Sequence, residues 1–155
     1  MRLATWNVNS LKIRLPHLLD WLAAQPIDVV CLQETKLTDD KFPREAIEQA
    51  GYEVVFSGQP TYNGVAILTR RDTVGAPSDV VVGNPLHSDE QRRLISATVG
   101  GVRVVCAYVP NGQSVDSDKY RYKLEWLDRL IDWLGPQIAQ GTPLALAGDY
   151  NIAPE

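Results

Sequence analysis

The sequence has few of the features that mark secreted or membrane proteins. Its 155 residues include only two cysteines, too few for the disulfide framework of a small secreted domain. No apolar run approaches the roughly 20 residues of a membrane-spanning helix, and the opening residues MRLATWNVNS do not form a signal peptide. We therefore expect a cytoplasmic protein that does not contact a membrane.

An excess of positive charge is also absent. There are 15 Lys and Arg residues against 19 Asp and Glu residues, and the formal net charge is -4. This balance argues against a protein that coats nucleic acid through many contacts to phosphate. It does not exclude a nuclease, because a metal ion bound by carboxylates can supply the positive charge that meets a phosphate.

The composition is that of one globular domain over residues 1–155, with 45% hydrophobic and 22% charged residues. Cys31 and Cys106 each lie in an apolar run, so we expect buried free thiols rather than metal ligands.

The first 50 residues predict a β-α-β unit followed by a short helix. Apolar runs at 2–8 and 27–33 are typical of buried strands. Leucines at helical spacing between them predict a helix over 10–24 with Ser10 as its cap. A second helix is predicted over 43–50.

The rest of the chain predicts further strands and one long helix. Strands are expected at 52–56, 65–69 and 144–147, with a hairpin of 94–99 and 102–109 across Gly100 and Gly101. The segment 72–91 is expected to be an exposed loop containing a short apolar stretch. The long helix should bury Tyr120, Leu124, Leu127, Ile131 and Leu134 and end at Gly135–Pro136. These elements favour an α/β architecture of mixed sheets flanked by helices, although periodicity does not give the strand order.

Polar residues follow the predicted strands, where ligands bind in sheets that are covered by helices. Glu34 and Asp149 would supply hard oxygen ligands suited to Mg²⁺ or Mn²⁺. Each such residue taken alone is more often a turn residue that bonds its own backbone, and Tyr108 is equally well a core aromatic. The complete set is Asn7, Asn9, Glu34, Tyr108, Asn111, Asp149 and Asn151.

Seven strings along the chain resemble the motifs of the exonuclease III and apurinic/apyrimidinic endonuclease family, within the endonuclease/exonuclease/phosphatase superfamily. They occur in the family's order and extend to both ends of the chain. The strings are TWNVNSLKIR (5–14), CLQETKL (31–37), NGVAIL (63–68), RLISA (93–97), YVPNG (108–112), KYRYKLEWL (119–127) and GDYNIAPE (148–155).

The resemblance implies a fold of two packed mixed β-sheets flanked by helices. It implies that Glu34 is the principal metal-binding carboxylate with Asn7 close to it, and that Asp149 acts as acid or base at the scissile phosphate. Asn151 and Tyr108 would hold that phosphate. Asn111 would contact the substrate backbone, and Asn9, which stands where some relatives have Asp, would also bind the substrate.

Arg93 and Lys123 also lie in matching strings and are candidates for substrate binding. Their alternatives are a buried ion pair for Arg93 and a solvated helix face for Lys123, and these alternatives are favoured. The family's later motifs, including an Asp-His pair, have no counterpart here, and His17 and His87 lie outside every matching string. We therefore expect that the intact protein continues beyond Glu155, that this chain is the first half of the fold, and that in isolation it is sticky and weakly active or inactive.

Three functions remain open from the sequence. The favoured one is a metal-dependent DNA-repair phosphodiesterase that incises 5′ to abasic sites and removes 3′ nucleotides from duplex DNA with abasic or 3′-blocked sites, as a monomer when full length. The second is a superfamily phosphodiesterase acting on a lipid, an inositol phosphate or RNA. The third is a non-catalytic half-domain that assembles with another chain.

Overall fold

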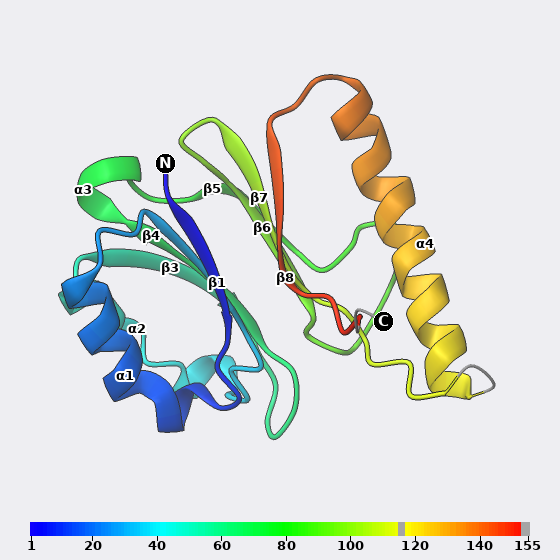
Figure 1. Ribbon diagram of the computed structural model, residues 1–155, viewed down its shortest axis with the longest axis horizontal. Helices are drawn as coiled ribbons and strands as arrows, with labels where there is room; N and C mark the ends of the chain where they lie inside the picture. Colours follow the sequence, from blue (N-terminus) through cyan, green and yellow to red (C-terminus); the bar gives the residue numbers. More distant parts are fainter. Residues whose placement is uncertain (115–116, 153–155) are drawn as a thin grey trace.

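The computed structural model describes residues 1–114 and 117–152, and it contains two four-stranded sheets packed face to face (Figure 1). The predicted α/β sandwich of two mixed sheets with flanking helices is confirmed. The last three residues of the GDYNIAPE string, 153–155, lie outside the described residues.

The first sheet begins with the predicted β-α-β unit. Strands β1 (Leu3–Asn7) and β2 (Val29–Gln33) pair in parallel, and the crossover between them is helix α1 (Leu11–Ala24). The strand order is β1-β2-β4-β3, with β4 antiparallel to both of its neighbours. The remaining elements of this half are the short 3-10 helix η1 (Asp39–Lys41), α2 (Arg44–Gln49), β3 (Tyr52–Ser57) and β4 (Val65–Arg70).

The second sheet has the order β5-β6-β7-β8 and mixes antiparallel pairs with one parallel pair, β7 and β8. The hairpin between β6 and β7 turns at Gly100 and Gly101, both with positive φ, which confirms the two-residue turn. The elements of this half of the chain are α3 (Arg71–Val74), β5 (Ser78–Val82), β6 (Leu94–Val99), β7 (Val102–Tyr108), α4 (Asp118–Ala139) and β8 (Leu144–Asp149).

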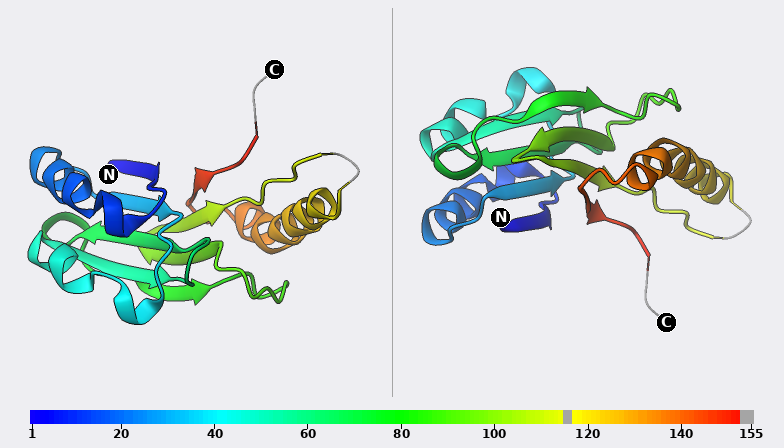
Figure 2. Two further views of the ribbon diagram at one scale, coloured as in Figure 1. Left: turned by 90° about the horizontal axis from the view of Figure 1, so that it is seen from below. Right: turned by 90° about the horizontal axis from the view of Figure 1, so that it is seen from above.

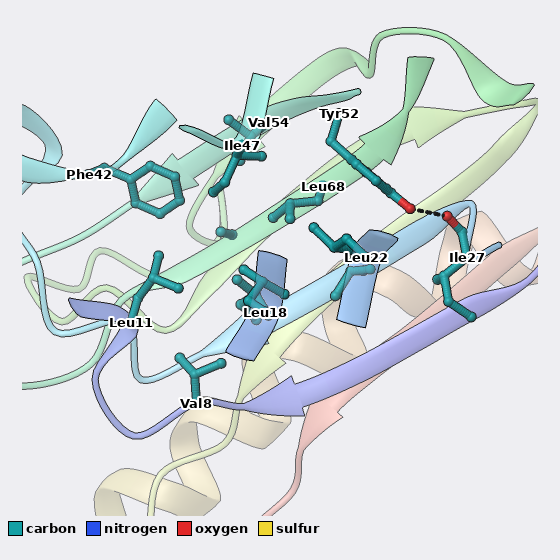
Figure 3. Close-up of a cluster of buried hydrophobic side chains, with 13 residues drawn as sticks. Val8, Leu11, Leu18, Leu22, Ile27, Phe42, Ile47, Tyr52, Val54 and Leu68 are labelled. Carbon is teal, nitrogen blue, oxygen red and sulfur yellow. Dashed lines mark hydrogen bonds between the residues drawn. The ribbon is translucent and has the colours of Figure 1, made fainter. Parts of the chain in front are cut away.

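Three apolar layers hold the sandwich together, and Figure 2 shows α1 and α2 at one end of the stack and α4 at the other. One layer lies between the first sheet and α1 and α2, where Leu11, Leu18 and Ile47 are fully buried and the Tyr52 hydroxyl donates to the Ile27 carbonyl at 2.6 Å (Figure 3). The layer between the sheets contains both cysteines as buried free thiols, as predicted. The third packs α4 on the outer face of the second sheet.

The cap predicted at Ser10 is wrong. Ser10 does occupy the N-cap position, but its φ is 87° and its side chain makes no capping bond. Its backbone N–H instead donates to the Glu34 carbonyl at 2.9 Å, because the loop after β1 is bonded to the loop after β2.

The long helix differs from its prediction at its end and on its buried face. It continues through Gly135 and Pro136 to Ala139, because Pro136 lacks one N–H but its carbonyl still accepts from Gln140. Leu124 and Ile131 are exposed, and the face on the sheet consists of Trp126, Leu130 and Leu134, with Leu127 and Trp133 at its border.

The segment 72–91 is more structured than the predicted loop. It includes the end of α3 and an edge strand, β5, whose residues are mostly exposed because the strand has a single neighbour and a register shift. No helix of the described residues is both long enough and apolar enough to cross a membrane.

Candidate active site

Two carboxylates from different sheets meet at one amide. Glu34 follows β2 in the first sheet, and Asp149 ends β8 in the second. The side-chain nitrogen of Asn7, at the end of β1, donates to Glu34 Oε2 at 2.6 Å and to Asp149 Oδ2 at 2.9 Å. Glu34 is 27 positions and Asp149 is 142 positions from Asn7 in the sequence, and both side chains meet at its amide. The hypothesis drawn from the sequence requires this convergence.

The turn that follows each strand fixes the side chain in place. Asn7 Oδ1 accepts from the backbone N–H of Asn9, Asp149 Oδ1 accepts from that of Asn151, and Asn111 Oδ1 accepts from that of Gln113, each at 3.0 Å. These are the local turn bonds that sequence reasoning offered as the alternative to a functional role. In Asp149 the turn bond uses Oδ1 and leaves Oδ2 to accept from Asn7. The same residue therefore has both the turn role and the site role.

The loops at this end are held in uncommon backbone conformations. Glu34 has a φ of 55°, and Lys36 and Asn151 have φ values of 57° and 48°. Non-glycine residues in the left-handed region carry a conformational cost, and such residues cluster at functional sites. The loop after β1 and the loop after β2 are also joined by two backbone bonds, Ser10 to Glu34 and Leu11 to Thr35.

Lys36 is a residue of this site that sequence reasoning missed. Its ammonium donates to Asn9 Oδ1 at 2.6 Å and lies 4.0 Å from Glu34 Oε1. The lysine sits inside the CLQETKL string, and that position was the available signal. Its positive charge partly offsets the two neighbouring carboxylates.

Tyr108 is placed beside the carboxylates and fixed by Arg93. The Arg93 guanidinium carbon lies 4.7 Å from the centre of the Tyr108 ring, and its Nη1 donates to the Tyr108 carbonyl at 3.2 Å. Burial raises the pKa of the Tyr108 hydroxyl, the charge of Glu34 raises it further, and the charge of Arg93 opposes both. The hydroxyl is therefore protonated at neutral pH and able to donate a hydrogen bond.

The favoured alternatives for Arg93 and Lys123 are both wrong. Within residues 1–114 and 117–152, Arg93 forms no ion pair, because its partners are an aromatic ring and uncharged oxygens. Lys123 is not on a solvated face, because its ammonium donates to the Asn151 carbonyl at 2.7 Å. Both side chains position backbone next to the carboxylates.

An open groove of about 650 Å³ lies over this end of the sheets. Asn7, Asn111, Asp149 and Asn151 line it, while Glu34 is not among the lining residues and contacts the groove through Asn7, with its side chain 22% exposed. Arg93, Lys123 and Tyr108 do not line the groove.

The donor set fits a magnesium-like cation better than a transition metal. Two carboxylates with neighbouring amides offer only hard oxygen ligands, and Mg²⁺ is commonly held by one or two carboxylates, waters and substrate phosphate. Among the described residues, no group of three or more His, Cys, Asp and Glu side chains is placed to hold a metal by itself. The Cys31 thiol is excluded as a ligand, because its hydrogen bond with the Cys106 thiol and its burial raise its pKa well above the ordinary value.

Neither His17 nor His87 lines the groove. His17 is exposed on α1. His87 is half-buried in the loop before β6, with Nε2 4.0 Å from Asp89 Oδ2.

Comparisons with known proteins agree with this geometry. Exodeoxyribonuclease III of Haemophilus influenzae is 34% identical over 99% of this chain and 58% of its own length. The 3′ phosphatase NExo from Neisseria, solved bound to product DNA hairpin, is 47% identical with a TM-score of 0.93, over 100% of this chain and 59% of that one. An AP endonuclease from Archaeoglobus fulgidus is 41% identical with a TM-score of 0.91, over the same shares.

The chain thus spans less than two thirds of the length of each of these relatives. The model of the Endonuclease/Exonuclease/phosphatase family, whose members depend on divalent metal, matches residues 4–155. Because this match extends over nearly the whole chain and includes both carboxylates, the chain belongs to the Endonuclease/Exonuclease/phosphatase family.

Proposed function

We propose that the protein is a metal-dependent DNA-repair phosphodiesterase, which incises duplex DNA 5′ to abasic sites and removes 3′ nucleotides or 3′ blocking groups. The observation that carries the proposal is the meeting of Glu34 and Asp149 at the Asn7 amide. Relatives named for DNA hydrolysis, and one solved with a DNA product, support the choice of DNA. We further propose that the protein is cytoplasmic, makes no membrane contact and is monomeric when full length.

In this proposal Glu34 and Asp149 hold Mg²⁺ or Mn²⁺, with the Asn151 amide oxygen as a further ligand. When bound, the cation offsets the negative charge that develops on the phosphate. Asn7 keeps both carboxylates in place, since the two hydrogens of its amide nitrogen are already donated to them. Asn7 therefore acts by orientation and has no hydrogen left for the substrate.

The remaining residues have roles set by the hydrogens and oxygens they still offer. Asp149 carries the proton transfer at the scissile phosphate. Tyr108 donates its hydroxyl to that phosphate, and Asn151 offers the second hydrogen of an amide whose first is donated to the Val109 carbonyl at 2.6 Å. Asn111, which lines the groove, contacts the DNA backbone, and Asn9 holds the Lys36 ammonium, which lies beside Glu34.

The test is cleavage by the intact protein of a duplex that contains one abasic-site analogue, with Mg²⁺. Glu34→Gln and Asp149→Asn should each lower kcat by about 10² to 10³, equivalent to about 2.7 to 4 kcal/mol of lost electrostatic stabilisation. Glu125→Gln, which neutralises an exposed carboxylate on α4, is the matched control and should leave kcat unchanged.

Sphingomyelin, inositol phosphates and RNA should be poor substrates in the same assay. Hydrolysis of one of them with no cleavage of DNA would assign the protein to another branch of the superfamily. An intact protein that cleaves none of these substrates and elutes in complex with another chain would favour a non-catalytic assembly role.

A further inference from the structure

A second, smaller hollow lies next to the groove. Its volume is about 210 Å³, and it is formed by three segments: the end of the loop before β6, the loop after β7 and the first turns of α4. Asn111 lines both this hollow and the groove, so the two adjoin at that residue.

The hollow is positively charged. Arg93 and Lys119 line it, its other polar lining residues are uncharged, and no carboxylate lines it. Two cations and no anion among the lining residues suit an anionic ligand. A carboxylate that the lining contacts, Asp89, accepts a hydrogen bond from the Tyr122 hydroxyl. Within the part of the chain that the structure describes, neither cation forms an ion pair.

The Arg93 guanidinium is held in place with donors to spare. Its Nε donates to Gln91 Oε1 at 2.7 Å and its Nη1 to the Tyr108 carbonyl at 3.2 Å. These two bonds use two of its five N–H groups. A planar guanidinium with free N–H groups matches the geometry of phosphate oxygens.

We propose that this hollow binds a backbone phosphate of the DNA strand, adjacent along that strand to the phosphate held in the groove. The inference rests on the proposed function and adds to it a second point of attachment for the same strand. DNA is favoured over a free phosphate-containing molecule because the hollow joins the groove at Asn111, so a continuous chain of phosphates can occupy both. Lys119 supplies charge, and Arg93 supplies directed hydrogen bonds.

The test measures DNA affinity, not cleavage, over a range of salt concentrations in metal-free buffer with the intact protein. Each phosphate contact contributes about 0.9 to the slope of log affinity against log salt. Lys119→Ala should therefore reduce the slope by about 0.9, which is about an eightfold difference in affinity at 0.1 M salt relative to 1 M. Arg129→Ala removes the same charge farther along the same helix, where Arg129 pairs with Asp132, and should leave the slope unchanged.

A second measurement locates the phosphate. The duplexes carry one uncharged methylphosphonate linkage, which is moved stepwise from the abasic site. At one position this neutralisation should lower the DNA affinity of the unmodified protein but not that of Lys119→Ala. Equal slopes for Lys119→Ala and Arg129→Ala, or no such position, would overturn the inference while leaving the proposed function intact. If the hollow takes only free anions, inorganic phosphate will compete without any dependence on linkage position, which also overturns it. An unmodified protein that neither binds nor cleaves the duplex would instead refute the proposed function.

Discussion

At the scale of single residues, Arg93 acts on both the position and the pKa of the Tyr108 side chain. Its charge lies over the Tyr108 ring and opposes two effects, burial and the charge of Glu34, that raise the pKa of the Tyr108 hydroxyl. Arg93 thus fixes the position of Tyr108 and limits how far its pKa rises. Its own backbone carbonyl also accepts from the Tyr108 N–H at 2.8 Å, so the two residues are bonded in both directions.

We predict that Arg93→Ala raises the pKa of Tyr108 further. Without the guanidinium, burial and Glu34 act unopposed on the phenolate, which is the charged form. The measurement is a pH titration of tyrosinate absorbance, with the titration of Tyr108→Phe in the same background subtracted to isolate one hydroxyl. Arg129→Ala should leave the Tyr108 titration unchanged, and a pKa that stays constant or falls in Arg93→Ala contradicts the assigned contact.

At the scale of elements, β8 depends on a glycine for its approach to β7. Gly148 has a φ of 152°, and a Cβ built on it would lie 1.8 Å from the Ala107 carbonyl oxygen, a backbone atom that cannot move aside alone. The next residue along the strand is Asp149. The tight pairing that places Gly148 therefore also places the carboxylate that Asn7 holds.

We predict that Gly148→Ala destabilises the fold by about 3 to 5 kcal/mol, at the upper end of what single substitutions cost, because a backbone clash has no cheap relief. Chemical denaturation measures the loss. Gly135→Ala is the matched control: a Cβ there meets nothing within 4 Å in α4, so helix propensity should make it neutral or stabilising by up to about 1 kcal/mol. Equal stabilities for the two variants would show that β8 does not need the close approach.

The elements also show what sequence patterns can and cannot predict. The β-α-β unit and the glycine hairpin were predictable, because buried strands and a two-residue turn have strong local signals. The buried face of α4 was not, because the helix also carries exposed apolar residues, Leu124 and Ile131, at a helical spacing on another face. Only tertiary contact decides between two such faces.

The convergence of the site residues was predictable only by resemblance. Local patterns place Asn7, Glu34 and Asp149 at strand ends, but the order of the strands and the packing of two sheets decide that these ends meet. Lys36 was missed for the same reason, since nothing local distinguishes it from a solvated lysine until its bond to Asn9 is seen.

At the scale of the whole molecule, the site lies across the junction of the two sheets. Glu34 belongs to the first sheet and Asp149 to the second, and the apolar layer between the sheets is the main contact that joins them. Two carboxylates at one amide also repel each other, and Lys36 offsets that repulsion only in part. A divalent cation held by both carboxylates would remove the repulsion and connect the sheets directly.

We therefore predict that Mg²⁺ stabilises the fold itself, independently of any substrate. A ligand present at 100 times its dissociation constant stabilises the folded state by about 2.7 kcal/mol. For a protein of this size each kcal/mol raises Tm by about 2 to 4 °C, so saturating Mg²⁺ should raise Tm by about 5 to 11 °C. Thermal unfolding followed by circular dichroism, at constant ionic strength, measures the shift.

Glu34→Gln should abolish that shift, because it removes the ligand contributed by the first sheet and leaves Asp149 as the only carboxylate ligand. Glu125→Gln should retain it in full, since Glu125 is an exposed residue of α4. If Glu34→Gln is stabilised by Mg²⁺ as much as the unmodified protein, the cation binds elsewhere, and the two carboxylates do not form a common site across the sheets.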